Sequence, residues 1–283
     1  MGLQTSTQEV FYVKNMIIKE IESQSLVTKS QLPEVDYVVN PYVGCGHGCV
    51  YCYARFMRRF TGHQEAWGEF VDVKINAGKL AEKELSRIGE KTVLLSSVTD
   101  PYQPLERKYQ LTRRVLQQAV ANHTPISILT KSNLVLRDLD LLSRLDYCEV
   151  GMSFSASEDN IRRVFEPRTS NVDQRLGALT KIKESGIRTY AFLGPILPGL
   201  TDLEDLFKHF ARVKIDWVMV ENLNVKGTIF PSLIDTVRQH YPRLVELYSQ
   251  IKKNPRGYWD PVKTELFELA NKYQLPVKLY FDH

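Results

Sequence analysis

Short apolar runs rich in β-branched residues alternate along the chain with longer amphipathic stretches. Continuous apolar runs of this kind are typical of strands that are covered on both faces. They fall at residues 35–39, 92–97, 125–130, 148–155, 188–194, 216–223 and 276–281. The pattern therefore predicts a set of buried strands, each separated from the next by enough residues for a helix.

The stretches between these runs have the periodicity of amphipathic helices. In one of them, Leu111, Val115 and Ala119 are four positions apart, which places their side chains on one face. In another, Asp260 is a suitable cap and Pro261 fits the first helical position. Helices are predicted for residues 111–122, 173–186 and 261–273.

Strand followed by helix, repeated about six times, requires a parallel sheet with right-handed crossovers. Polar side chains follow several of the strands, and a β/α barrel gathers such side chains at one rim. They are Ser96, Ser97, Thr130, Lys131, Ser132, Ser153, Ser155, Glu221 and Asn222. We therefore expect a full or partial barrel rather than an open sheet. Residues 35–283 would form it, with a C-terminal strand and helices, after an irregular leader at residues 1–34.

Composition and charge exclude several classes of protein. With 283 residues, of which 43% are apolar and 25% charged, the chain has the composition of a single globular domain. No apolar run approaches the ~20 residues needed to span a bilayer, and the amino terminus lacks the pattern of a secretory signal. The net charge of +4 is too small to indicate nucleic-acid binding by itself. We expect a cytoplasmic protein without membrane association.

Three of the four cysteines crowd into one glycine-rich loop, "NPYVGCGHGCVYCYARF", with the spacing C-x3-C-x2-C. They are Cys45, Cys49 and Cys52. Three thiolates leave a metal site one protein ligand short, and no second C-x2-C or H-x3-H pair is present for structural zinc. An iron–sulfur cluster held by three cysteines would have one open iron that can bind a small molecule. A zinc site completed by His47 or Cys148 is the alternative interpretation.

This spacing, after the first strand of a β/α barrel and before the helical "ARFMRRF", resembles the hallmark of the radical S-adenosylmethionine (SAM) enzymes. The resemblance implies a partial (β/α)6-type TIM barrel in which Cys45, Cys49 and Cys52 hold a [4Fe–4S] cluster. It also implies that SAM binds the open iron and yields a 5′-deoxyadenosyl radical, which abstracts hydrogen from a substrate. An electron donor such as flavodoxin or ferredoxin would then be a partner.

Further stretches resemble one branch of that family, the enzymes similar to spore photoproduct lyase, often described as DNA repair photolyase-like. They are "NPYVGCGHGCVYCYAR", "SSVTDPYQPLERKYQLTR", "LTKSNLVLRDLDLL", "FEPRTSNVDQRLGAL" and "PILPGLTD". The resemblance implies a lyase-type or transferase-type radical enzyme that acts on a nucleic-acid lesion. One departure is that "LLSSVTD" has serines where spore photoproduct lyase has a hydrogen-donating cysteine. Repair of spore photoproduct itself is therefore not expected.

Four residues outside the cysteines are candidates for binding SAM. The aromatic residue before the last cysteine commonly contacts adenine in these enzymes, which gives this role to Tyr51, although ordinary packing is the alternative. Lys131 can neutralise the carboxylate of SAM and Ser153 can donate a hydrogen bond, and both match cofactor-binding positions of spore photoproduct lyase. Ser97 ends the second strand and can face the cofactor or the substrate.

Two further groups of charged residues remain open to more than one interpretation. Glu166 and Arg168 are expected to form a structural ion pair. The arginines after the cysteine loop, interleaved with phenylalanines, are suited to contact phosphates. The nearly balanced charge and the missing thiol instead favour a small metabolite or a peptide as substrate. A hypothesis from another class is a non-catalytic scaffold that binds zinc.

Overall fold

The main feature of the computed structural model, which describes residues 16–225 and 229–281, is a curved sheet of eight strands. Their order is β11-β10-β9-β8-β7-β6-β3-β2, and all neighbours are parallel except β2 and β3. They are β2 Val27–Lys29, β3 Tyr37–Val39, β6 Val93–Leu95, β7 Ile126–Thr130, β8 Cys148–Phe154, β9 Arg188–Leu193, β10 Trp217–Glu221 and β11 Val277–Tyr280. Every strand predicted from the sequence is therefore confirmed.

The sheet curves into a partial barrel. Within the described residues, its edge strands β2 and β11 are not hydrogen-bonded to each other. Glu34, between β2 and β3, nevertheless accepts a hydrogen bond from Nζ of Lys278 in β11 at 2.8 Å. A residue beside one edge strand thus contacts the opposite edge strand, so the sheet curves round on itself although no backbone ladder closes it.

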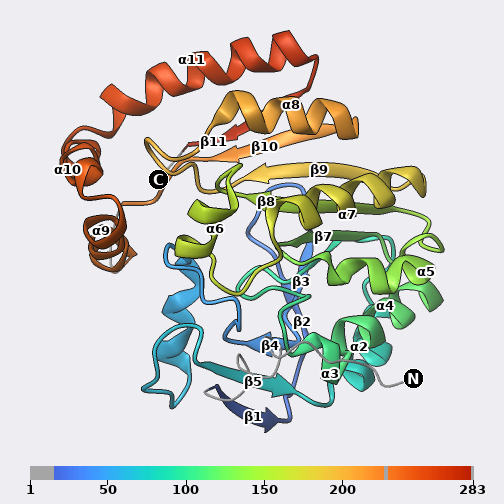
Figure 1. Ribbon diagram of the computed structural model, residues 1–283. Coiled ribbons are helices and arrows are strands. Elements are labelled where there is room, and N and C mark those ends of the chain that lie inside the picture. Colours follow the sequence, from blue (N-terminus) through green and yellow to red (C-terminus); the bar gives the residue numbers. More distant parts are fainter. Residues whose placement is uncertain (1–15, 226–228, 282–283) are drawn as a thin grey trace, which may run out of the picture.

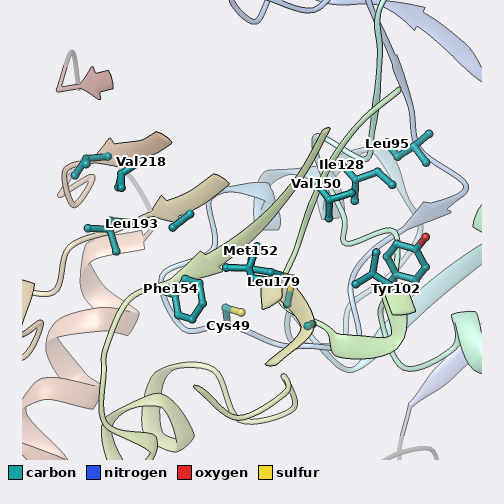
Figure 2. Packing of buried hydrophobic residues seen from close by; sticks show 14 of the residues in the cluster. Cys49, Leu95, Tyr102, Ile128, Val150, Met152, Phe154, Leu179, Leu193 and Val218 are labelled. Atoms are coloured by element: carbon teal, nitrogen blue, oxygen red, sulfur yellow. The ribbon is translucent and has the colours of Figure 1, made fainter. Parts of the chain in front are cut away.

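The apolar runs of the sequence form the core on the sheet. Figure 2 shows Leu95, Ile128 and Val150 on the adjacent strands β6, β7 and β8, where register places them side by side. All three side chains are fully buried. In the same view, Cys49 lies near Met152 and Phe154, toward the carboxyl end of β8. The core therefore extends to the cysteine loop.

Helices cover the outer side of the sheet and gather at one end of it (Figure 1). Helices α4, α5, α7, α8 and α11 lie outside the main sheet, whereas α6, α9 and α10 lie at the end toward which the arrowhead of β9 points. The helices are α2 Ala77–Leu85, α3 Glu106–Tyr109, α4 Leu111–Ala121, α5 Leu139–Leu142, α6 Asp159–Phe165, α7 Val172–Glu184, α8 Leu203–Val213, α9 Ile229–His240, α10 Val245–Lys253 and α11 Pro255–Tyr273. The 3₁₀ helices are η1 Tyr53–Phe60, η2 Asn133–Asp138 and η3 Pro242–Leu244. No helix in the described ranges is long and apolar enough to cross a bilayer.

The segment before Pro33 is not irregular, contrary to the prediction, although its first 15 residues lie outside the described part. Strand β1 (Ile17–Ile21) pairs in parallel with β5 (Phe70–Lys74), which also pairs with β4 (Tyr42–Val43) in a small second sheet. Strand β2 extends the main sheet. The carboxylate of Glu84 accepts hydrogen bonds from the backbone next to β2, at Leu26 and Val27. Strand β1 depends on a partner that is distant in the sequence and β2 has only three residues, so local pattern does not identify them.

The start predicted for the last helix was also wrong. Helix α11 begins at Pro255 rather than at Pro261, which lies inside it. The side chain of Asn254 accepts a hydrogen bond from the backbone N–H of Gly257. Asn254 and Pro255 thus supply a complete helix start more than one and a half turns earlier, at about 1.7 turns. Burial of Trp259 anchors this added segment, which compensates for the proline in the helix interior.

We predict that Gly151→Ala destabilises the sheet. A Cβ atom at Gly151 would lie 2.2 Å from the ring of Tyr190 on the neighbouring strand β9. That ring cannot easily move, because it stacks on Trp217 at 5.0 Å and its hydroxyl donates to the carbonyl of Ile128 at 3.1 Å. Overpacking of this kind should lower the free energy of unfolding by about 1–3 kcal/mol, measured by urea denaturation of the metal-free protein.

The matched control is Gly177→Ala in α7. A Cβ atom at Gly177 meets nothing within 4 Å. Since alanine has the higher helix propensity, this change should leave the protein equally stable or raise its free energy of unfolding by up to about 1 kcal/mol. Equal stabilities for the two variants would contradict the packing described for β8 and β9.

Candidate functional site

The cysteine loop follows β4 and is anchored by the connection between β6 and α3. The side chain of Gln103 accepts a hydrogen bond from the backbone N–H of Gly46 at 2.8 Å. The hydroxyl of Thr99 donates to the carbonyl of Gly44 at 2.6 Å, and Gln103 donates to Thr99 at 3.1 Å. The two sides of the site are therefore joined by hydrogen bonds before any ligand is bound.

The three thiols of the loop lie within reach of each other's charge. Cys45 and Cys49 are buried and Cys52 is half-buried. Burial, together with the neighbouring thiols, raises the pKa of Cys49 and raises the pKa of Cys52 to about 12. Without metal the two thiols therefore remain protonated, and any metal must displace their protons on binding.

The donor set, three cysteine thiols in one loop, is chemically suited to an iron–sulfur cluster. No three His, Cys, Asp or Glu side chains in the described ranges are arranged to hold one metal ion. In an iron–sulfur cubane each cysteine binds a different iron, so its ligands do not converge on one point. Three cysteines in one anchored loop meet that requirement.

Of the two residues considered as a fourth zinc ligand, His47 is engaged through Nδ1 and Cys148 is excluded by its position. His47 is buried, and its Nδ1 lies 3.3 Å from the carboxylate of Asp100. Burial alone would lower the pKa of His47, but Asp100 and the thiol of Cys45 raise it to about 9. Cys148 begins β8, about 20 Å along the strand from the rim, and it is buried. It cannot complete the site.

Three of the predicted cofactor-binding residues are brought together at the strand ends. Lys131 follows β7 and its Nζ donates to the hydroxyl of Ser153, on β8, at 2.7 Å. The same Nζ lies 5.7 Å from the centre of the Tyr51 ring, which the cysteine loop supplies. The ammonium of Lys131 and the hydroxyl of Ser153 therefore lie beside the aromatic ring that the cysteine loop contributes, and each of the three groups comes from a different element.

Ser97, the fourth candidate, has different partners. Its backbone N–H donates to the side chain of Asn40 at 3.0 Å, and its carbonyl accepts a hydrogen bond from the hydroxyl of Tyr53. None of its described hydrogen bonds connects it to Lys131 or Ser153. The structure thus places Ser97 on the rim beside Asn40, a residue that was not singled out in the sequence.

A buried carboxylate, Glu166, connects the elements of the site. It accepts hydrogen bonds from the hydroxyl of Tyr51, from Ser155 at 2.8 Å and from Arg175, and Nζ of Lys131 lies 3.9 Å away. Burial would raise the pKa of Glu166, but the charges of Arg175 and Lys131 outweigh it and hold the pKa at about 2. Glu166 is therefore a fixed anion that orients both Tyr51 and Lys131.

The ion pair predicted between Glu166 and Arg168 is wrong, because Arg175 occupies the carboxylate instead. Arg175 is fully buried on α7 and also donates to the carbonyl of Ser153 at 2.7 Å. The burial of Arg175 is indicated by its position in the sequence. Arg175 is three positions after Val172 and four before Leu179, so it lies on the apolar face of an amphipathic helix.

We predict that Arg175→Met lowers the free energy of unfolding by about 3–5 kcal/mol, because it leaves a buried carboxylate without its main partner. Arg163→Met is the control, since the Arg163 side chain is 72% exposed and its change should stay within about 0.5 kcal/mol. Urea denaturation of the metal-free protein measures both. A loss below about 1 kcal/mol for Arg175→Met would contradict the role assigned to this pair.

Comparison with known proteins agrees with this arrangement. The model of the radical SAM superfamily matches residues 39–211. An uncharacterized protein of Methanocaldococcus jannaschii is 35% identical over 232 residues, which cover 82% of this chain and 86% of the relative. The radical SAM Nα-GlyT isomerase of Pseudomonas phage M6 is 24% identical over 247 residues, covering 83% of this chain and 51% of that protein.

Solved structures show the same fold. Spore photoproduct lyase complexed with dinucleoside spore photoproduct superposes with a TM-score of 0.67 at 17% identity, covering 99% of this chain and 87% of that chain. A mutant of that enzyme with bound AdoMet and the same dinucleoside gives a TM-score of 0.59 at 18% identity, covering 86% and 72%. This fold implies SAM and a [4Fe–4S] cluster as cofactors. The chain belongs to the radical SAM superfamily.

Proposed function

We propose that the protein binds a [4Fe–4S] cluster through Cys45, Cys49 and Cys52 and uses SAM to abstract a hydrogen atom from its substrate. The observation that carries this proposal is the three-thiol loop anchored beside the Lys131–Ser153 pair. When bound, the cluster and SAM supply reductive cleavage of a sulfonium to a 5′-deoxyadenosyl radical. Reduction requires an external electron donor, such as a flavodoxin or a ferredoxin.

The residues around the loop would bind and orient SAM. Lys131 presents a positive charge for the carboxylate, and Ser153 offers its hydroxyl beside it. The ring of Tyr51 is fixed through its hydroxyl by Glu166 and Ser155, and we assign it to contact with adenine. Ser97, beside Asn40, is assigned to the remaining part of the cofactor or to the substrate.

The cluster is tested by comparing two cysteine variants. After anaerobic reconstitution, the wild-type protein and Cys148→Ala should contain iron and sulfide and form 5′-deoxyadenosine with SAM and dithionite. Cys49→Ala should lose the cluster and that product, because it removes one of three proposed ligands. Cys148 is the matched control, since it is also a buried thiol but lies at the other end of the barrel. One zinc per chain without sulfide would contradict the proposal.

The SAM site is tested by affinity. Lys131→Met should weaken binding of SAM to the cluster-loaded protein about 10- to 100-fold, because a hydrogen bond to a charged group contributes about 1.5–3 kcal/mol. Isothermal titration under anaerobic conditions measures the dissociation constant. Lys181→Met, an exposed lysine on α7, is the control and should bind as the wild type does. An unchanged dissociation constant for Lys131→Met would remove Lys131 from the site.

We further propose that the substrate is a nucleic-acid lesion. Residues 53–60 and 229–256 together contain eight basic and two acidic residues, an excess of six, whereas the whole chain has an excess of four. The rest of the protein is therefore slightly acidic, and positive charge is concentrated in two segments. This distribution is the electrostatic pattern of a protein that binds a polyanion.

Both basic segments border the cysteine loop. Helix η1 begins directly after Cys52 and ends with Phe60, which is 73% exposed. At the end of α9, the ring of Tyr241 stacks on Phe165 at 6.0 Å, and the carbonyl of Phe165 accepts a hydrogen bond from the backbone N–H of Val50. Arginines and an exposed aromatic ring beside the site are suited to phosphates and bases.

Oligonucleotide binding tests this substrate class. Arg58→Gln with Arg59→Gln should reduce the slope of log K against log salt by about 1.4–1.8, since each lost phosphate contact contributes about 0.7–0.9. Fluorescence anisotropy with a single-stranded oligonucleotide measures the slope. Lys79→Gln with Lys83→Gln removes the same charge from α2, on another side of the molecule (Figure 1), and should change nothing. Equal slopes for all three proteins would favour a metabolite or a peptide as substrate.

The reaction proposed here differs from repair of spore photoproduct. The chain has four cysteines, of which three are in the loop and Cys148 is at the far end of β8. The end of β6 carries Ser96 and Ser97, whose O–H bonds are poor hydrogen-atom donors. No thiol of this chain therefore lies at the end of β6, where it could give a hydrogen atom to the product radical.

A further inference from the structure

The guanidinium of Arg168 lies against two glycines from separate loops. A Cβ atom at Gly48 would lie 2.5 Å from Nη2 of Arg168, and one at Gly68 would lie 2.6 Å from the same atom. The Cβ position of Gly68 is also 2.6 Å from Cα of Gly48. The two loops thus touch backbone to backbone, and the guanidinium covers the contact without room for a side chain on either glycine.

This arginine has no anionic partner in the described part of the chain, although it is half-buried. Other buried arginines are paired, as Arg162 is with Asp159 and Arg175 with Glu166. A half-buried arginine without a carboxylate partner is uncommon, because buried charges are normally paired. Its position places the unpaired charge beside Gly48, which lies between two of the proposed cluster ligands, Cys45 and Cys49.

We propose that Arg168 provides a fixed positive charge that offsets the negative charge of the cluster held by the cysteine loop. This charge would stabilise the reduced form of the cluster. This inference rests on the function proposed above. Reduction adds one electron from the external donor, and no bond of Arg168 forms or breaks. A fixed positive charge nearby favours the more negative state, so it raises the reduction potential. Partial burial limits screening by salt.

The test compares Arg168→Gln with Arg168→Lys in the cluster-loaded protein. In a redox titration followed by absorption and electron paramagnetic resonance, Arg168→Gln should have a more negative midpoint than the wild type. We expect the ratio of reduced to oxidised cluster at a fixed potential to fall about tenfold, which is about 59 mV for one electron. Arg168→Lys keeps the charge and should stay close to the wild type.

Arg163→Gln is the matched control, because it removes the same charge from a side chain that is 72% exposed and paired with Asp159. Its midpoint should equal that of the wild type. The iron and sulfide contents, and the melting temperature of the metal-free proteins, should be similar in all variants. Where Arg168→Gln cannot hold the cluster, Arg168→Met replaces it: a midpoint more negative than that of Arg168→Lys supports the inference, and an equal midpoint contradicts it.

One outcome overturns the inference while leaving the proposed function intact, namely a wild-type midpoint in Arg168→Gln at equal iron and sulfide content. If binding of SAM or of an oligonucleotide is weaker in that variant, Arg168 is a ligand-binding residue instead. If the wild-type protein itself takes up no cluster, the proposed function fails first and the inference falls with it.

Discussion

One buried negative charge, on Glu166, fixes how the parts of the site lie relative to each other. A carboxylate removed from water is tolerated only when charged and hydrogen-bonding partners surround it. Here those partners come from four elements: Tyr51 from the cysteine loop, Lys131 from the end of β7, Ser155 from the end of β8 and Arg175 from α7. If one of these elements shifted, Glu166 would lose a partner that stabilises its charge. The strand ends and the loop are therefore held in fixed positions relative to each other.

The cysteine loop is held from two directions. Thr99 and Gln103 bind its first half through the backbone, and Glu166 holds its second half through Tyr51. Of the thiols between these anchors, Cys49 is buried and Cys52 is half-buried, and any metal that binds them must displace their protons. The fold thus sets the positions of the thiols, whereas the positive charge that displaces their protons would be supplied by the metal. The basic segment 53–60 follows the loop directly, and Tyr241 of the segment 229–256 packs on Phe165, which is hydrogen-bonded to the loop at Val50.

Much of the sheet could be predicted from the sequence, because parallel strands buried on both faces read as continuous apolar runs. Strand β5 was missed since Asp72 and Lys74 interrupt its apolar pattern, and its partners are far away in the chain. Spacing and positions at strand ends predict the three cysteines, Lys131 and Ser153 as site residues, and the structure places Lys131 and Ser153 in contact. The pairing of Glu166 could not be predicted from neighbours in sequence, because its partner sits on the next helix, and only packing brings the two together.

The contact between Glu34 and Lys278 has a consequence for the size of what the barrel can admit. Both side chains are about half exposed, and an ion pair of this kind contributes at most about 1 kcal/mol. Elsewhere neighbouring strands are joined by backbone ladders, which resist separation collectively. Among the described strands, the two edges β2 and β11 are therefore the neighbours that no backbone ladder joins, and widening the sheet along this line would leave every strand register unchanged. A bulky molecule could exploit such a seam from the side, while the opposite wall keeps its shape.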